Sequence, residues 1–353
     1  MSTTARTPRS LAPDPTRSRR NVALLALLPF VLVSMVLTVG IGGVAIPADQ
    51  TAAILWSHLA GGTPAADGSA DLIVWQLRFP RVLLGAIVGA GLAASGAGLQ
   101  AIVRNPLADP FLLGISSGAT TGAAAAILLG FGASLGVSGL TGSAFLGALG
   151  AIALVLAVAR VGGRVAVDRL VFAGITVGFA LTAVTNFVVF ASDSRDGVRA
   201  VMFWTLGSLA QSSWTSLPLA AGITGAGLAV LMLWARRFDA IAIGDDTALA
   251  LGTDPTRFRA LAAATIAVMV AAGVAVSGLI GFVGLVVPHL ARRMVGHRHD
   301  ALLPVSALTG AGLLVWADAL ARVAFAPREL PLGILTALIG TPLLLLLVHR
   351  SRR

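Results

Sequence analysis

VALLALLPFVLVSMVLTVGIGGVAI, the stretch from Val22 to Ile46, runs for 25 residues without a charged side chain. An α-helix needs about 20 apolar residues to cross the ~30 Å hydrocarbon layer of a bilayer. A cleaved signal peptide is the alternative, but its apolar region is only about 7–15 residues long. The stretch also lacks a clear A-x-A cleavage site. It therefore predicts a transmembrane helix.

The composition of the whole chain agrees with this prediction. Of the 353 residues, 57% are hydrophobic and only 11% are charged, and the mean hydropathy is +0.91. A soluble domain has about 25% charged residues. So few charges could not cover the surface of a soluble protein of this length, and most of the surface must face lipid.

Apolar segments of similar length recur along the chain, and glycine, proline and charged residues mark their ends. The spacing predicts an all-α, polytopic membrane protein with about ten transmembrane helices. The two spans between 259 and 295 are joined tightly at Val276–Gly278. The predicted spans are 22–46, 81–103, 111–130, 138–159, 169–191, 213–235, 259–276, 278–295, 302–321 and 331–348.

The arginines test this count. Segments on the cytoplasmic side of membrane proteins carry an excess of Lys and Arg. With ten spans and a cytoplasmic N-terminus, 19 of the 25 basic residues fall inside and 6 outside. An even split is expected by chance, so both termini are predicted to be cytoplasmic. Because the arginines are scattered between apolar runs, the net charge of +10 does not indicate nucleic-acid binding.

The predicted organisation is a disordered cytoplasmic tail (1–21), a permease domain (22–348) and a cytoplasmic tail (349–353). The longest interior cytoplasmic loop is 236–258. Within it, Asp245 and Asp246 begin an Ala/Leu-rich turn that Gly252 closes, which predicts a short helix. The helix is interpreted either as a plain surface helix or as a rigid knob that fits a groove on a motor subunit.

Residue types that are absent exclude several functions. The chain has no cysteine, which excludes disulfides, Cys-ligated zinc and iron–sulfur clusters. All 25 basic residues are arginine, and a Walker A loop needs a lysine to reach the nucleotide phosphates. Any ATP-dependent work must therefore be done by a separate subunit, and we expect no catalytic residues, no metal site and no cofactor in this chain.

Small residues recur at four-residue spacing inside the spans, for example at Gly85/Gly89 and Gly174/Gly178. This spacing lets helix backbones approach closely in a bilayer. It indicates either ordinary membrane packing or a tightly packed body whose helices can slide.

Three stretches resemble the iron-siderophore and cobalamin permease family of ABC importers (FecCD type). They are RFPRVLLGAIVGAGLAASGAGLQAIVRNPLADPFLLGISSGA (78–119), MFWTLGSL (202–209) and a block from 278 to 348 that begins GLIGFVGLVVPHLARRM. The resemblance implies a type II ABC importer permease architecture and a dimer with a second copy or a paralogue. It also implies two cytoplasmic ATPase subunits and an extracytoplasmic substrate-binding protein. The cargo implied is a metal chelate, for which we predict a ferric siderophore, with haem or cobalamin as alternatives.

Arg78, Arg81 and Arg322 lie on the predicted outer face, against the positive-inside bias. In the cobalamin importer, arginines at matching positions pair with glutamates on the binding protein, so the resemblance implies docking. Arginine–carboxylate pairs are short and often bidentate, which suits specific but reversible docking. Arginines that snorkel to the interface are the alternative.

The resemblance also implies a cytoplasmic gate at Asn105 and Leu107, in a turn that Pro106 and Pro110 stiffen; a plain turn is the alternative. The span 169–191 is expected to line the translocation path by analogy with the family, through Thr176, Thr182, Thr185 and Asn186. These side chains would offer weak contacts to a bulky chelate, or the threonines would bond back to their own helix. Contact with the ATPase is assigned to Asp245, Asp246, Leu249, Leu251 and Gly252.

Two further features have competing interpretations. Asp318 is an acid inside a predicted span, which suggests a proton relay, but Arg322 four residues later favours an i,i+4 ion pair. His297 and His299 could hold a metal, yet they lack a full set of ligands. A carrier driven by a gradient would need more intramembrane acids and broken helices in repeated halves, so it is the weaker alternative.

Overall fold

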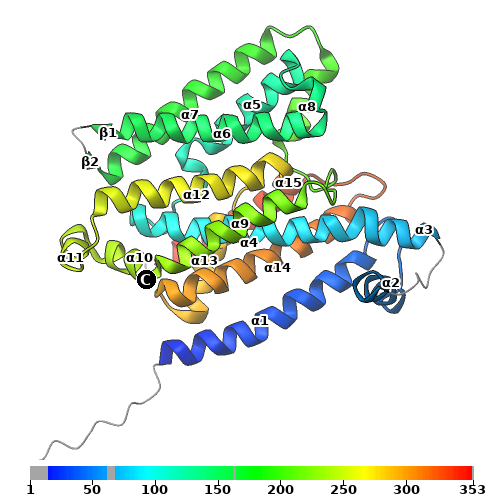
Figure 1. Cartoon of the computed structure of the whole chain (residues 1–353), viewed down its shortest axis with the longest axis horizontal. Coiled ribbons are helices and arrows are strands. Elements are labelled where there is room, and N and C mark those ends of the chain that lie inside the picture. Colours follow the sequence, from blue (N-terminus) through cyan, green and yellow to red (C-terminus); the bar gives the residue numbers. More distant parts are fainter. Residues whose placement is uncertain (1–14, 62–67, 162–163, 352–353) are drawn as a thin grey trace, which may run out of the picture.

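The computed structural model describes residues 15–61, 68–161 and 164–351, most of which lie in helices (Figure 1). The shorter elements are the π-helix η1 (Leu72–Arg78), the 3-10 turns η2 (Pro110–Leu113) and η3 (Ala133–Leu135), and the antiparallel two-residue strands β1 (Arg160–Val161) and β2 (Arg164–Val165). The α-helices are α1 (Pro15–Gly40), α2 (Ala48–Ala60), α3 (Gly68–Asp71), α4 (Phe79–Val103), α5 (Ile115–Leu129), α6 (Val137–Ala159), α7 (Val167–Phe190), α8 (Arg195–Thr205), α9 (Leu217–Leu233), α10 (Ala235–Ile243), α11 (Asp245–Ala250), α12 (Pro255–Ser277), α13 (Val283–Val295), α14 (His299–Val323) and α15 (Leu332–Ser351).

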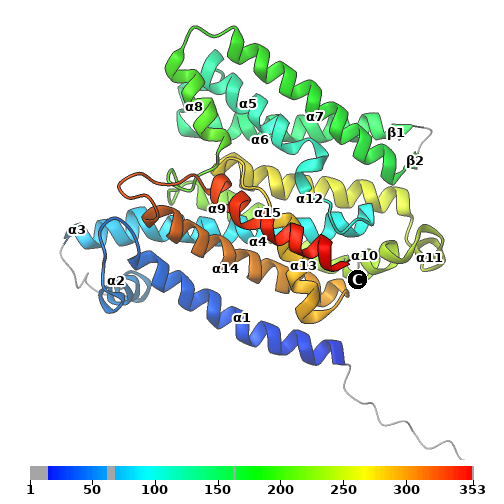
Figure 2. The same cartoon turned by 180° about the vertical axis from the view of Figure 1, so that it is seen from behind.

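The long helices run side by side, and their connections gather at two ends of the molecule. The start of α1, the end of α15, the β1–β2 ladder and the α10–α11 pair lie at one end, which we call the termini end (Figures 1 and 2). Helices α2, α3 and α8 lie at the opposite end, which we call the far end. Both ends of the described chain therefore lie on the same side, as an even number of spans requires.

A helix lies at each of the ten predicted spans, which confirms the all-α, polytopic fold. By length and composition, six helical segments of the described chain can cross a bilayer. Helices α9 and α10 pass the same test together but are bent by 58° at their junction, while α5 and the apolar part of α15 are shorter. The six are Ser18–Gly40, Gly68–Val103, Val137–Ala159, Val167–Phe190, Pro255–Ser277 and His299–Val323.

The first helix is shifted relative to the predicted span 22–46 and extends into the predicted tail. It begins at Pro15 and ends at Gly40. Proline is favourable in the first turn of a helix because its missing N–H would have no partner there. Residues 1–14 of the predicted tail lie outside the described residues. At the other end of the chain, α15 continues to Ser351, so most of the predicted C-terminal tail is helical.

The predicted bounds of the span over 278–295 are wrong. Only the 13 residues of α13 are helical there, a length of about 20 Å, so the helix alone is shorter than the hydrocarbon layer. Gly278 and Phe282 both have positive φ, at +66° and +68°. A Cβ on Gly278 would lie 2.3 Å from the carbonyl oxygen of Trp204. The chain is therefore pressed against the end of α8 before α13 begins.

The predicted loop 236–258 is largely helical, and the short helix expected to begin at Asp245 is confirmed as α11. Gly252 closes it with φ +78°. The amide of Gly252 donates to the carbonyl of Leu249, and the amide of Thr253 donates to that of Ala248. These two bonds form a Schellman motif, which explains the glycine at this position.

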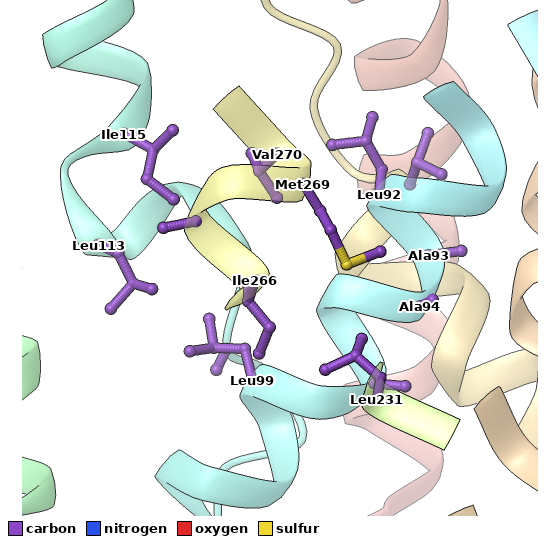
Figure 3. Close-up of a cluster of buried hydrophobic side chains, with 14 of the residues drawn as sticks. Leu92, Ala93, Ala94, Leu99, Leu113, Ile115, Leu231, Ile266, Met269 and Val270 are labelled. Carbon is purple, nitrogen blue, oxygen red and sulfur yellow. The ribbon is translucent and has the colours of Figure 1, made fainter. Parts of the chain in front are cut away.

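Helix α4 is the centre of the molecule, because 20 of its 25 residues are buried. Its Leu92 and Leu99 pack against Ile266 and Met269 of α12 and against Leu231 of α9 (Figure 3). These large side chains fill the space between helices. Burial of one such side chain stabilises the fold by roughly 1.5–3 kcal/mol in water, and packing replaces this term where the outside is lipid.

Elsewhere the helices touch through glycine, as the small-residue spacing predicts. A Cβ on Gly89 of α4 would lie 2.2 Å from the carbonyl oxygen of Gly310 on α14. A Cβ on Gly118 of α5 would lie 2.4 Å from the carbonyl oxygen of Gly147 on α6. Any larger residue at these positions would push the two backbones apart.

Candidate functional sites

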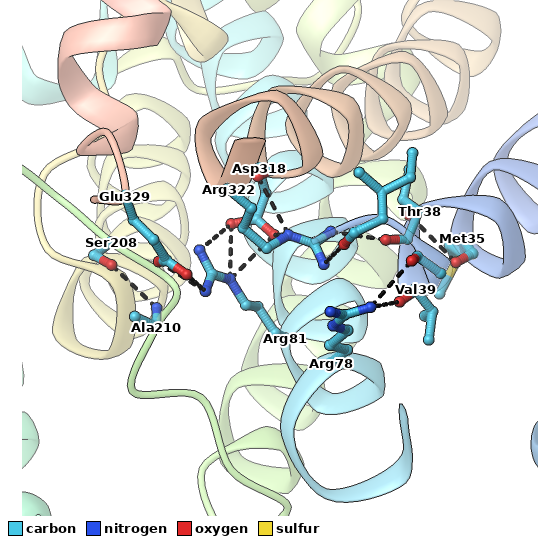
Figure 4. Close-up of polar contacts among 12 residues, drawn as sticks. Met35, Thr38, Val39, Arg78, Arg81, Ser208, Ala210, Asp318, Arg322 and Glu329 are labelled. Atoms are coloured by element: carbon cyan, nitrogen blue, oxygen red, sulfur yellow. Dashed lines mark hydrogen bonds and ion pairs between the residues drawn. The ribbon is translucent and has the colours of Figure 1, made fainter. Parts of the chain in front are cut away.

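Five charged side chains come together at the far end of the bundle (Figure 4). Arg78 ends η1, and Arg81 lies in the first turn of α4. Asp318 and Arg322 lie one turn apart on α14, and Glu329 lies in the connection between α14 and α15. We call these five residues the far-end cluster.

Asp318 is the buried centre of this cluster, with 1% of its side chain exposed. Arg81 approaches its carboxylate through Nε and Nη2, each 2.9 Å from Oδ1. Arg322 Nε lies 3.1 Å from Oδ2, which confirms the predicted i,i+4 ion pair. Two guanidinium groups thus pair with the acid, which suits a structural role better than a proton relay.

Arg78 and Arg322 also bind the connection between α1 and α2. The last carbonyl groups of a helix have no partner within the helix, and these two side chains supply donors to them. Arg78 donates to the carbonyls of Val39 (3.2 Å), Gly40 (3.0 Å) and Val44 (2.6 Å), and Arg322 donates to those of Ile41 (2.6 Å) and Thr38 (2.9 Å). The two arginines therefore fix the far end of α1 against α4 and α14.

Glu329 closes the cluster on its exposed side. Arg81 Nη1 lies 3.0 Å from Oε1 and 2.9 Å from Oε2 of Glu329. The Glu329 side chain is 43% exposed, whereas that of Arg81 is 10% exposed. The cluster combines three arginines with two acids, so it carries one positive charge in excess.

The three predicted docking residues are therefore brought together, but all are buried in this chain. Arg78 and Arg81 are 8% exposed and Arg322 is 5% exposed. Each already donates to groups of the chain itself, so their role in docking stays a prediction. Of the two acids paired with Arg81, Glu329 is the exposed one, at 43% against 1% for Asp318.

The predicted gate residues, Asn105 and Leu107, lie in the turn between α4 and α5 at the termini end. Asn105 Oδ1 accepts the amide of Leu107 at 2.9 Å, and Leu107 is 46% exposed. Asp109 Oδ1 accepts the amide of Phe111 at 2.9 Å, and burial raises the pKa of Asp109 to about 6. Local hydrogen bonds make the turn well defined, and its role as a gate stays a prediction.

Thr176, Thr182 and Asn186, predicted to line the path, are exposed on α7. The Thr182 hydroxyl donates to the carbonyl of Gly178 at 2.8 Å and lies 3.2 Å from Ser117 Oγ of α5. The alternative of threonines bonding back to their own helix is therefore confirmed for Thr182, and also for Thr185, whose hydroxyl donates to the carbonyl of Leu181 at 3.0 Å. Thr185 is buried, and its hydroxyl lies 2.8 Å from that of Thr121 on α5.

Large apolar side chains surround these polar positions on α7. Phe172, Phe179, Phe187 and Phe190 are 69%, 74%, 69% and 88% exposed. Their successive spacings of seven, eight and three residues place them along one stripe of the helix. The stripe is thus a wide apolar face, interrupted by Thr176, that no other part of the described chain covers.

Asp245 ties α11 to the helix bundle at the termini end. Its Oδ2 lies 2.9 Å from Nη1 of Arg259, whose side chain is only 3% exposed. Arg104, in the turn that carries the predicted gate, lies 3.4 Å from Oδ1. Arg259 also donates to the carbonyl of Ile102 at 3.2 Å. Hydrogen bonding from Arg259 lowers the pKa of Asp245, so the carboxylate is charged at neutral pH.

The other residues assigned to ATPase contact point outward. Asp246 and Gly252 are exposed, and Leu249 and Leu251 are 58% and 67% exposed. The predicted set therefore divides into one internal tether, Asp245, and an exposed apolar knob. Its contact with an ATPase stays a prediction.

His299, one of the two histidines considered as metal ligands, has a partner within the chain. Its Nδ1 lies 2.6 Å from Oδ1 of Asp239 on α10. Among the residues that the structure describes, no group of three or more His, Asp or Glu side chains could hold a metal ion.

Sequence reasoning missed Glu329 and Arg259. Glu329 is the only glutamate in the 353 residues, which was an available signal. Arg259 was counted only as a cytoplasmic charge, and its contact with Asp245 depends on how α11 folds back onto α12. Neither contact follows from sequence spacing.

Comparison with known proteins now defines the class. A family model described as the FecCD transport family matches residues 30–350. The cobalamin import system permease protein BtuC of Halobacterium salinarum is 45% identical over 281 residues, which cover 80% of this chain and 74% of that protein. The hemin transport system permease protein HmuU of Yersinia pestis is 40% identical, over 79% of this chain and 84% of that one.

A solved structure agrees with the family match. A metal-chelate type ABC transporter in an inward-facing conformation superimposes with a TM-score of 0.81 and 32% identity, over 93% of this chain and 98% of that one. The fold is thus that of a type II ABC importer permease. The chain belongs to the FecCD transport family.

Proposed function

We propose that the chain is the permease subunit of an ATP-driven importer that moves a metal chelate, a ferric siderophore, across the cytoplasmic membrane by alternating access. The observation that carries the proposal is the α11 knob. It presents exposed Leu249 and Leu251 at the termini end, while Asp245 ties it to both Arg259 and the turn of the predicted gate. A force applied to α11 would thus reach the helix ends around the path.

The partner at this knob is a cytoplasmic ATPase subunit. The chain has no lysine with which to build a Walker A loop, so the nucleotide must bind elsewhere. Placing the termini end in the cytoplasm puts 19 of the 25 arginines on that side, as the positive-inside rule favours. The far end then faces outward.

An extracytoplasmic binding protein would deliver the cargo to the far-end cluster. The excess positive charge of the cluster favours an acidic partner, and Arg81 can pair with a further carboxylate if Glu329 moves. The exposed stripe of α7 would pack against a second copy or a paralogue, with Thr176 and Asn186 at the path between them.

Cobalamin is the second candidate cargo, favoured by the 45% identity to the BtuC protein of Halobacterium salinarum. A gradient-driven carrier is disfavoured, since the buried Asp318 is fully paired with Arg81 and Arg322 and is a poor proton carrier.

Uptake into proteoliposomes tests the proposal. The purified chain is reconstituted with and without its ATPase subunits and binding protein, and uptake of labelled ferric siderophore, cobalamin and haem is measured. We expect uptake of one chelate only when the ATPase and ATP are both present. Uptake without nucleotide that follows a pH gradient would refute ATP-driven import, and uptake of cobalamin alone would replace the siderophore as cargo.

A further inference from the structure

The segment that carries Glu329 is bonded along its backbone to the far ends of two other elements. The amide of Leu330 donates to the carbonyl of Ala321 at 3.0 Å. The amides of Leu332 and Gly333 donate to Gly207 (3.0 Å) and Leu206 (2.9 Å) in the α8–α9 connection. The segment 329–333 therefore holds together α14, α15 and the α8–α9 connection.

This segment forms one wall of a cavity of about 460 Å³ at the far end. The rest of the lining comes from α5, α6, α8, the α8–α9 connection and α12, and it includes Trp204 and Ser277. Ser277 is only 3% exposed, although it lines the cavity. Movement of the segment would therefore widen the entrance to buried parts of the bundle.

Glu329 is the side-chain contact that fixes this segment to α4. Arg81 holds two carboxylates through different edges, since Nε and Nη2 face the buried Asp318 and Nη1 faces the half-exposed Glu329. Only the Nη1 edge can be vacated without leaving a buried charge unpaired. Loss of Glu329 from this edge would raise the net charge of the remaining cluster from one to two.

We propose that Glu329 is an internal stand-in for a carboxylate of the binding protein, so that docking exchanges one carboxylate for another at Arg81 Nη1. This inference rests on the proposed function. The incoming carboxylate restores the charge balance that the departure of Glu329 disturbs, and the exchange frees the segment 329–333. Docking is thereby linked to opening of the cavity at the far end.

The first test needs no binding protein. Because the chain has no cysteine, Ser277→Cys gives a single labelling site inside the cavity. The rate of labelling by a membrane-impermeant maleimide is measured in the permease–ATPase complex, with and without Glu329→Gln. We expect the rate to rise at least about threefold, because local opening becomes easier when the ion pair is removed. Asp196→Asn, an exposed acid on α8, is the matched control and should leave the rate unchanged. An equal rate in Glu329→Gln would overturn the proposal.

The second test measures affinity of the complex for the binding protein encoded with it. Glu329→Gln removes the internal competitor, so the dissociation constant should fall several-fold, while Arg81→Gln should raise it. Arg81→Lys keeps a positive charge beside the buried Asp318, so this variant is the safer one for folding. It should also weaken docking. Tighter binding without Glu329 is not expected of a purely structural residue, and weaker or equal binding would reject the exchange. Failure of the exchange is distinct from failure of the proposed function, which would appear as absent ATP-dependent uptake by the unaltered chain.

Discussion

At the scale of single residues, Asp318 is the acid on which the far end depends. Replacement by Asn leaves Arg81 and Arg322 buried without a counter-charge, and breaking a buried pair in this way costs about 3–5 kcal/mol. We expect Asp318→Asn to lower the midpoint of thermal unfolding clearly in detergent. Asp246→Asn, which removes an exposed acid, is the control and should change it little. A variant that folds with unchanged stability but loses transport would instead support a proton relay.

The same residue shows what spacing in a sequence can and cannot predict. The pair of Asp318 and Arg322 follows from i,i+4 geometry within one helix, and it is confirmed. Arg81 lies 237 residues away, and its contact depends on how α4 packs against α14. The resemblance identified Arg78, Arg81 and Arg322 as a group, but it did not predict their burial or their partner Glu329.

At the scale of elements, helix α11 was predicted from the sequence, but the ion pairs through which Asp245 attaches it to the bundle were not. Asp245→Asn would weaken the bonds to Arg259 and Arg104 and free α11 from the bundle. We expect the backbone amides of 245–252 to exchange with deuterium roughly tenfold faster, while the rest of the bundle is unchanged. Asp246→Asn, on the neighbouring exposed position, should leave exchange unchanged. If Asp245→Asn does not alter exchange either, Asp245 is not the tether.

Helix α2 was not predicted from the sequence, because 13 residues are too few for a span and its apolar pattern is mixed. Figures 1 and 2 both show α2 nearly end-on beside the far end of α1, so α2 runs across the spans and not along them. Ile54 and Leu55 face the molecule, whereas Trp56 and Leu59 are 72% and 69% exposed. Trp is enriched at the membrane–water interface, so this exposed face fits the headgroup region at the far end.

A spin label can test this placement in the cysteine-free chain. A nitroxide at Trp56→Cys in vesicles should collide more with oxygen, which partitions into lipid, than with a water-soluble nickel complex. A label at Ser194→Cys, on the exposed connection before α8, should show the opposite preference. Equal exposure of Trp56→Cys to the nickel complex would place α2 in water.

At the scale of the whole molecule, the long apolar segments predicted the fold because each span must satisfy its own backbone in lipid. The short helix α13 was mispredicted for a tertiary reason, since Gly278 is pressed against the carbonyl of Trp204. The division into a termini end and a far end follows from the count of spans. The ion pairs that join distant segments at each end depend on how the helices pack, so the sequence alone did not predict them.

The exposed face of α7 has a consequence for assembly. Phe179 on α7 is 74% exposed and Leu25 on α1 is 76% exposed. Leu25 therefore serves as a control position of similar exposure. If α7 packs against a second copy around a two-fold axis, Phe179 is near its own equivalent, whereas Leu25 faces lipid.

Two cysteines form a disulfide only when their Cα atoms lie within about 7 Å. We therefore expect mild oxidation in membranes to cross-link either Phe179→Cys or a neighbouring position on the stripe, such as Asn186→Cys, into dimers, and to leave Leu25→Cys monomeric. A stripe that cross-links no better than Leu25→Cys would show that α7 does not meet a second copy, and it would favour a paralogue as the partner permease.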